Sequence, residues 1–209
     1  RAVSKGGEAY TTFRVGEPHG RPSARVQLIH DMLADIDSVK ITTNLWGERW
    51  SKLVQNAMGN GLSAASGMSN KQFTQNDITR RLSIRLAGEA VRAGLSQGLS
   101  LEKIAGVDPN VWVQAAEELN TGANDTPVLD ELEARMLTQA ERMSDTARPS
   151  MGQDMIKGRR TEIEFLNGLV VQRAHEMGLE APANAGLIAA VQMVERGDAP
   201  PDLARVQDI

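Results

Sequence analysis

Apolar residues recur every three or four positions along most of this sequence, which is the spacing of one buried face of an α-helix. The clearest stripe lies within residues 76–94 and consists of Ile78, Leu82, Leu86, Ala90 and Ala93. β-branched runs are scarce and aromatic residues make up only 3% of the chain, so few strands are expected. From residue 45 onward the pattern predicts no convincing strand. It predicts helices over about residues 45–58, 76–94, 109–119, 128–143, 150–157, 162–177 and 183–196.

The first 43 residues follow a different pattern. Residues 9–15 ("AYTTFRV") are the best strand candidate, and the turn-rich stretch "GEPHGRPS" follows them. Residues 23–34 are then expected to form a helix. Residues 38–43 ("SVKITT") alternate between apolar and polar and fit a second strand. The apolar face of this first helix would consist of Val26, Ile29 and Leu33.

The helix predicted over residues 162–177 has clear start and stop signals. Thr161 and Glu164 have the spacing of a capping box, in which each side chain binds a backbone amide at the helix start. Gly178 ends the helix. The stripe expected in the core consists of Ile163, Leu166, Val170, Ala174 and Met177. After the last helix, the Pro-rich segment "GDAPPDLARVQDI" is expected to fray.

Composition narrows the function classes. A net charge of −4 and a pI near 5.5 argue against a general nucleic-acid binder, which shows a basic patch. The 209 residues include no cysteine, which excludes disulfides, cysteine nucleophiles and zinc–thiolate sites and fits a reducing compartment. The longest apolar runs are far shorter than the roughly 20 residues that a membrane-spanning helix needs.

Three familiar site patterns carry little weight here. His19, His30 and His175 are scattered and lack a carboxylate at ligand spacing, so no metal site is expected. "GLSQG" at residues 94–98 matches G-x-S-x-G, but it lies at a predicted helix end with no strand before it. No G-x-G-x-x-G occurs, so the chain carries no dinucleotide-binding fingerprint of its own.

One line of polar residues lies in the stretch "RWSKLVQNAMGNGLS", residues 49–63. Lys52, Asn56 and Asn60 are four positions apart, so each is rotated by only about 40° from the last and the three share one stripe of a helix. Buried carboxamides need hydrogen-bond partners, which favours a polar cleft with a bound ligand. An ordinary water-facing helix side also explains the pattern. The pattern alone favours this second interpretation but does not decide between the two.

A second informative stretch is "RPSMGQDMIKGRRTEIEFLNG", residues 148–168. Glu162 lies at the predicted first helical position, where the helix dipole alone favours a carboxylate. Ser150 and the glutamine three positions later have the spacing of another capping box. Asp154 fits an ion pair with either arginine at residues 159–160. Each of these residues therefore has a purely structural explanation.

Together, the two stretches resemble the ketopantoate reductase (2-dehydropantoate 2-reductase) family. The helical C-terminal domain of that family carries a W-x-K-L-x-x-N-x-x-x-N helix near its start, which begins here at Trp50. It later carries the signature S-M-x-Q-D-x-x-x-G-R-x-T-E-I-[DE]-x-L-N-G, nearly complete here over residues 150–168, and a P-x-N at Pro182 and Asn184. "VGEPHGRPSARV" looks like the turn near the end of the family's Rossmann domain. The resemblance covers roughly residues 13–197, and the long signature is its specific part.

The resemblance implies a mainly α fold. Residues 44–209 would be a helical substrate and dimerisation domain of the 6-phosphogluconate-dehydrogenase C-terminal-like type, and residues 1–43 a β-α-β remnant of an N-terminal NADP-binding Rossmann domain. Because the chain starts in mid-pattern at Arg1, we expect a piece of a longer protein that is inactive alone.

The implied activity is the NADPH-dependent reduction of ketopantoate to pantoate, in pantothenate and coenzyme A biosynthesis in the cytoplasm. The missing part of the Rossmann domain would bind most of the NADP(H). A small 2-oxo acid is the expected substrate, a homodimer through the helical domain is compatible with the family, and no nucleic-acid or membrane partner is expected.

Roles are carried over from the family position by position. Lys52 would be the catalytic residue that donates a proton to the ketone oxygen. Glu162 would bind the nicotinamide–ribose region of the cofactor or assist the acid chemistry from there. The substrate would be bound by Asn56 and Asn60, which hold its hydroxyl and carbonyl groups, by Asn70, and by Ser150, which donates to its carboxylate.

The sequence also departs from the family. Gly61 stands where members often have proline, which we interpret as a harmless loop change. Segment 96–147 is longer than in compact members, includes a loop-rich part at 96–127 and its own Trp112, and is expected to reshape the cleft or an oligomer face. Two alternatives therefore stay open. One is a reductase of a different 2-oxo acid, and the other is a helical dimerisation module without activity.

Overall fold

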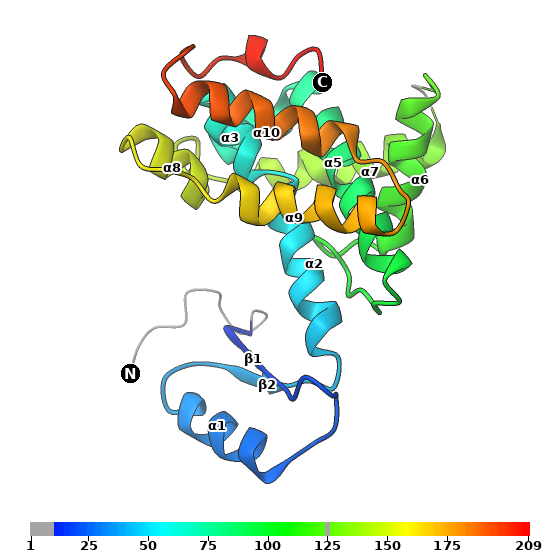
Figure 1. Ribbon diagram of the computed structural model, residues 1–209, viewed down its shortest axis with the longest axis vertical. Helices are drawn as coiled ribbons and strands as arrows, with labels where there is room; N and C mark the ends of the chain where they lie inside the picture. The colour runs from blue at the N-terminus through cyan, green and yellow to red at the C-terminus, as the bar shows by residue number, and fades with distance from the viewer. Residues whose placement is uncertain (1–10, 124–125) are drawn as a thin grey trace. The chain divides into compact units, whose positions relative to one another are not determined.

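The computed structural model describes residues 11–123 and 126–209. By its internal contacts, the chain divides into two compact units, residues 1–50 and residues 51–209. The division falls inside helix α2 (Leu45–Ala57), which therefore contributes residues to both units. Figure 1 shows the order of the elements along the chain, which is mainly helical, as the sequence predicts.

The first unit contains the predicted strand–helix–strand arrangement. Strand β1 (Phe13–Val15) pairs in parallel with β2 (Val39–Ile41), and Phe13 lies opposite Val39. Both strands are shorter than predicted. Part of the first predicted strand, residues 9–10, lies outside the described residues.

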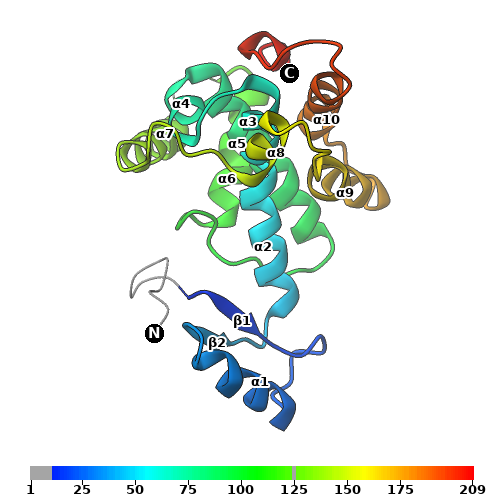
Figure 2. The same ribbon diagram turned by 90° about the vertical axis from the view of Figure 1, so that its left-hand side faces the viewer.

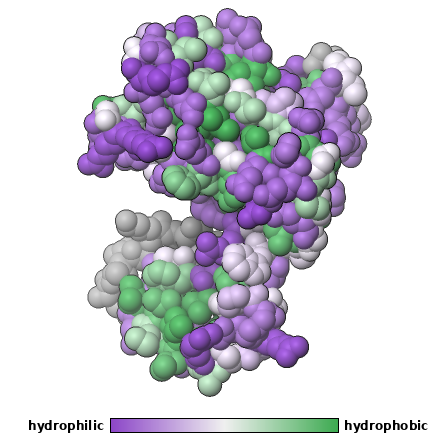
Figure 3. All heavy atoms as spheres, in the orientation of Figure 1, coloured by the Kyte–Doolittle hydropathy of each residue, from purple (hydrophilic) through white to green (hydrophobic). Residues whose placement is uncertain are grey.

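Helix α1 (Ala24–Ala34) connects the two strands and starts after Ser23, whose hydroxyl accepts a hydrogen bond from the Val26 amide (3.2 Å). The prediction of its buried face is mostly wrong, because only Val26 is buried. Ile29 is 39% exposed. Figure 3 shows apolar side chains gathered on the surface of this unit, and the exposed ones on and just after α1 are Leu28, Ile29, Met32 and Ile36.

Helix α5 (Asp77–Ser96) is the central element of the second unit. It packs against α6 (Pro109–Asn120), and the two helices come so close at Gly88 that a Cβ there would overlap the Ala116 Cβ. The predicted stripe of α5 is confirmed apart from Ile78, which is 43% exposed. The long run of buried positions in α5 provides the surface on which the other helices assemble.

Within the second unit, α5 also packs against α4 (Asn70–Gln75), α9 (Ile163–Glu176) and α10 (Pro182–Glu195). Figure 2 shows α9 and α10 side by side on one flank, and α7 (Pro127–Ala140) with α4 on the other. Helices α3 (Asn60–Ser66) and α8 (Ser150–Ile156) pack against each other. The longer predicted helices are all found close to their predicted bounds. Among the described residues after position 44, the only β-type pairing is an isolated bridge between Ile104 and Val107.

Helices α3 and α4 are absent from the sequence prediction. Helix α3 has seven residues, six of them buried, and is rich in glycine, alanine and serine. Such a segment shows no amphipathic period and is held by packing. Helix α4 has six residues and starts at a capping box formed by Ser69 and Gln72, which is too short a signal to separate from a turn.

The capping box predicted for α9 is wrong. Glu162 is the residue that precedes the helix, and the Thr161 amide donates to the Glu195 carboxylate (2.5 Å) on α10 instead. Glu164 accepts a hydrogen bond from Gln192 of α10 (3.0 Å). Glu195 of α10 therefore takes the place of Glu164. The Thr161 hydroxyl accepts the Ile163 amide (3.4 Å) instead of the Glu164 amide.

The prediction that the C-terminal segment frays is also wrong. The Asp202 amide donates to the Ala65 carbonyl (3.0 Å), and a short 3-10 helix follows at Leu203–Arg205. Val206 is 1% exposed and belongs to the core of the unit. The Arg85 guanidinium donates to the Ile209 backbone oxygen (2.6 Å), so this segment is docked at both ends. No helix of the described residues is both long and apolar enough to cross a membrane.

Candidate functional site

The Lys52–Asn56–Asn60 stripe lies where α2 leads into α3. Lys52 and Asn56 are one turn apart on α2, and Asn60 is the first residue of α3. The opposite side of α2 carries Val54 and Ala57, which are both fully buried, so burial of that apolar side directs the polar stripe away from the core.

The stripe lines a pocket of about 340 Å³ in the second unit. Lys52, Asn56, Asn60 and Asn70 all contribute to its wall. The sequence left open whether the stripe faces water on a convex surface or a cleft, and the structure places it in a concave site. The volume lies within the range of small-molecule sites, about 300–1,000 Å³.

The polar groups of this wall are available to a ligand. Within residues 11–123 and 126–209, no hydrogen bond or ion pair engages the Lys52 ammonium or the carboxamides of Asn56, Asn60 and Asn70. An ammonium offers three donors, and each carboxamide offers two donors and an acceptor. The wall can therefore bind a small molecule that carries carbonyl, carboxylate and hydroxyl oxygens.

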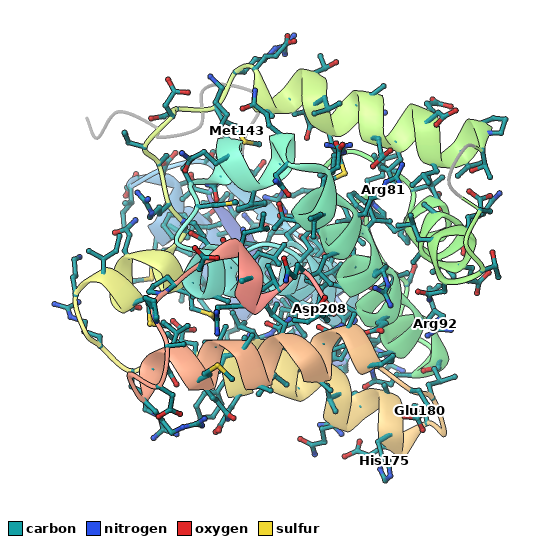
Figure 4. All side chains as sticks on the ribbon, turned by 90° about the horizontal axis from the view of Figure 1, so that it is seen from above. Arg81, Arg92, Met143, His175, Glu180 and Asp208 are labelled. Atoms are coloured by element: carbon teal, nitrogen blue, oxygen red, sulfur yellow. The ribbon has the colours of Figure 1, made fainter. Side chains whose placement is uncertain are left out.

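The long segment 96–147 supplies a second wall of the same pocket. Trp112 of α6, Met136 and Gln139 of α7, and Met143 just after α7 all line it. Figure 4 labels Met143 beside α4, which α7 contacts. This wall is mainly apolar, and residues of segment 96–147 contribute directly to the pocket.

A buried ion cluster fixes the position of α7. The Glu133 carboxylate, one turn before Met136, accepts hydrogen bonds from Arg80 and Arg81 of α5, both at 3.1 Å from the guanidinium Nε. Figure 4 labels Arg81 at this junction. Arg80 also donates to Asp77 (2.6 Å). These contacts join the apolar wall to the central helix.

Ser150 and Glu162 do not line this pocket. Ser150 is the exposed first residue of α8. Its predicted capping box is wrong, because the Gln153 side-chain amide donates to the Arg148 backbone carbonyl (2.9 Å) instead. Glu162 is exposed at the start of α9. Pro149, next to Ser150, does line the pocket, so α8 begins at its edge.

Two further expectations concern charge and metal ions. Asp154 pairs with Arg159 (3.8 Å), which is one of the two predicted partners. Among the described residues, no group of three His, Asp or Glu side chains is arranged to hold a metal ion.

Two asparagines of the sequence motifs have structural roles. The Asn167 side-chain amide donates to the Ala57 backbone carbonyl at the end of α2 (3.0 Å) and to the side-chain oxygen of Asn184 (2.9 Å). The Asn184 amide donates to Glu89 of α5 (2.7 Å). All three side chains are at most 4% exposed. This buried network links α5, α9 and α10 to the end of the helix that carries Lys52 and Asn56.

Gly61 lies inside α3 rather than in a loop, so the interpretation as a harmless loop change is wrong. A Cβ at this position would be 2.8 Å from the Leu187 Cδ2 and 3.0 Å from the Ile163 Cδ1. The absence of a side chain therefore lets α3 approach α9 and α10 directly below the Asn60 turn.

Sequence reasoning missed several residues of the pocket. Phe73 and Thr74 belong to the unpredicted helix α4, and Ser83 is a buried residue of α5 that follows the stripe residue Leu82. Position 83 was not part of the predicted stripe, so the sequence pattern gave no signal that this serine is buried. The pocket lining of Phe73 and Thr74 had none either, because it depends on how α4 packs.

Comparisons with known proteins give a consistent result. A family model described as "Ketopantoate reductase PanE/ApbA C terminal" matches residues 44–195. A 2-dehydropantoate 2-reductase from Archaeoglobus fulgidus is 27% identical over 192 residues, which are 91% of this chain and 54% of that protein. The chain spans about half the length of the curated relatives that it matches.

Solved structures share the fold. A dimeric ketopantoate reductase from Staphylococcus aureus superposes with a TM-score of 0.59 at 17% identity, covering 86% of this chain and 54% of that chain. A D-mandelate dehydrogenase in complex with NADH superposes with a TM-score of 0.67 at 17% identity, covering 88% of this chain and 54% of that chain.

Proposed function

The chain belongs to the ketopantoate reductase PanE/ApbA C-terminal family, and from this premise we propose that it is the substrate domain of an enzyme that reduces ketopantoate to pantoate with NADPH. The observation that carries the proposal is the pocket in which Lys52, Asn56, Asn60 and Asn70 meet. These are the residues to which the family motif assigns catalysis and substrate binding.

The chemistry needs a proton donor and fixed hydrogen bonds. Reduction adds a hydride to the ketone carbon, and negative charge develops on the ketone oxygen. Lys52 donates a proton to that oxygen and gives the 2-hydroxy acid. Asn56, Asn60 and Asn70 orient the substrate, since a carboxamide can both donate and accept without adding charge.

The cofactor supplies the hydride. Glu162 is the residue of this chain that would bind the cofactor. It is exposed at the start of α9, and its carboxylate can accept hydrogen bonds from ribose hydroxyls. The sequence has no glycine-rich turn for the phosphates. We therefore assign most of the binding of NADP(H) to residues outside this chain and expect these 209 residues alone to be inactive. Ser150 would donate a hydrogen bond to the substrate carboxylate from the edge of the pocket, where α8 begins.

The proposed domain assignment also follows from the family resemblance. Residues 1–43 would be the end of a Rossmann domain, and residues 44–209 the helical domain. The exposed apolar side chains of α1 support this assignment, because an α/β layer normally covers such a face. A homodimer through the helical domain is part of the proposal, and the S. aureus neighbour is described as dimeric.

A second candidate is a reductase of another 2-oxo acid with the same catalytic frame. The apolar wall of Trp112, Met136 and Met143 favours it, because this wall comes from segment 96–147, in which the sequence is expected to depart from compact family members. The similar fold of a D-mandelate dehydrogenase is consistent with it.

NADPH oxidation by the full-length protein, measured with ketopantoate and a panel of other 2-oxo acids, tests the proposal. The highest kcat/KM with ketopantoate supports the first candidate, and the highest value with another acid supports the second. No oxidation with any 2-oxo acid would overturn both.

A further inference from the structure

The pocket of the second unit has two chemically different parts. Its rim includes Lys52, which is exposed, and the partly buried carboxamides of Asn56, Asn60 and Asn70. Its most buried apolar side chains are Phe73 and, from the second wall, Trp112 and Met136, and these three are called the floor. They are 8%, 1% and 8% exposed. The floor therefore offers an apolar surface below a polar rim.

Ser83 is the exception in this floor. It is 1% exposed, it lines the pocket, and its Oγ has no hydrogen-bond partner in the described part of the chain. The other polar groups of the floor are satisfied: the Trp112 indole donates to the Ile104 carbonyl (3.2 Å), and the Thr74 hydroxyl donates to the Asn70 carbonyl (2.8 Å). Because a buried hydroxyl without a partner lowers stability, Ser83 is placed to bond a group that enters the pocket.

We infer that Ser83 determines specificity by adding a hydrogen bond to the distal hydroxyl of a 2-oxo acid, beside those expected from Asn56 and Asn60. The apolar body of this acid packs against Phe73, Trp112 and Met136. The inference rests on the proposed function, since it takes the Lys52 side of the pocket as the place of the ketone. A 2-oxo acid held there by its ketone and carboxylate has only its side chain left to reach the floor. The substrate class is therefore a 2-oxo acid with an apolar side chain that carries a hydroxyl.

This role differs in its kinetics from a catalytic one. The distal group does not change charge during the reaction, so its hydrogen bond is equally strong in the ground state and the transition state. Loss of such a bond raises KM and leaves kcat nearly unchanged. It also acts only on substrates that have the distal hydroxyl.

The test uses Ser83→Ala in the full-length protein with NADPH and two matched pairs of acids. One pair is ketopantoate and 3,3-dimethyl-2-oxobutanoate, and the other is 4-hydroxyphenylpyruvate and phenylpyruvate; in each pair the second acid lacks the hydroxyl. We expect the kcat/KM preference for the hydroxylated acid to fall about tenfold in Ser83→Ala, through KM, in the pair that the enzyme uses. An unchanged preference in that pair would overturn the inference, because it would mean that Ser83 does not bind the hydroxyl of the substrate.

Two controls separate this result from other failures. Ser66 is buried outside the pocket and its hydroxyl donates to the Leu62 carbonyl (2.6 Å), so Ser66→Ala should lower the melting temperature. Ser83→Ala should keep or raise it, because its hydroxyl has no partner to lose. If the wild-type protein reduces none of the four acids, the proposed function fails. In that case, calorimetry measures the binding of the same acids to the wild-type protein and to Ser83→Ala. Equal affinities of the two proteins for the hydroxylated acids would overturn the role of Ser83.

Discussion

Glu89 of α5 accepts two hydrogen bonds from Asn184, one from the backbone amide (2.9 Å) and one from the side-chain amide (2.7 Å). Its other carboxylate oxygen accepts the Ala183 amide (2.9 Å). The two backbone amides lie in the first turn of α10, where a helix leaves its amides without intrahelical partners. No local side chain caps this helix. A carboxylate 4% exposed on another helix thus takes the place of the N-cap.

Glu89→Gln should destabilise the protein by about 1–3 kcal/mol, because the new NH₂ group faces donors and at least one buried amide loses its acceptor. Urea unfolding of the variant measures this change. Glu180→Gln, at an exposed carboxylate, is the matched control and should leave the midpoint unchanged. Equal midpoints for both variants would show that the Glu89 contacts do not hold α10.

Gly61→Ala should also destabilise, by about 1–3 kcal/mol, because the added methyl group meets Leu187 and Ile163 in a close-packed core. Gly168→Ala is the matched control. Its Cβ would be 3.6 Å from the nearest atom, the Glu164 Cβ, in a helix interior. That substitution should raise stability by up to about 1 kcal/mol. A stabilising Gly61→Ala would contradict the account of how α3 packs.

Glu17 predicts a pH dependence in the first unit. Hydrogen bonds from Arg25 and Ser23 lower the pKa of its carboxyl below the ordinary value. The unfolded chain therefore takes up this proton first as the pH falls. The stabilising contribution is complete above the unfolded-state pKa and is lost as the pH drops through the folded-state pKa. In an NMR titration, Arg25→Ala should raise the pKa of Glu17, and an unchanged value would contradict the assigned cause.

The sequence predicted the parts of the fold that depend on local pattern. The apolar stripes located the longer helices, and the four-residue spacing placed Lys52, Asn56 and Asn60 on one stripe. That this stripe lines a pocket, with Asn70 beside it, agrees with the interpretation as a cleft wall. The roles of these residues in catalysis and binding remain predictions.

Features that depend on distant contacts were not predictable. Glu195 binds the Thr161 amide from the far end of α10, and this contact takes the place that the local spacing gave to Glu164 in a capping box. The C-terminal segment docks because Val206 enters a core built by other helices. The free hydroxyl of Ser83 is visible only when every possible partner has been placed around it.

The most direct test of the central claim is the turnover of a Lys52→Met variant of the full-length protein with NADPH and the best 2-oxo acid of the panel. Lys103→Met is the control, since Lys103 is exposed and does not line the pocket. Loss of the proton donor should lower kcat about 10²–10⁴-fold, and the control should keep wild-type turnover. A Lys52→Met variant with wild-type kcat would contradict the assignment of this pocket as the active site.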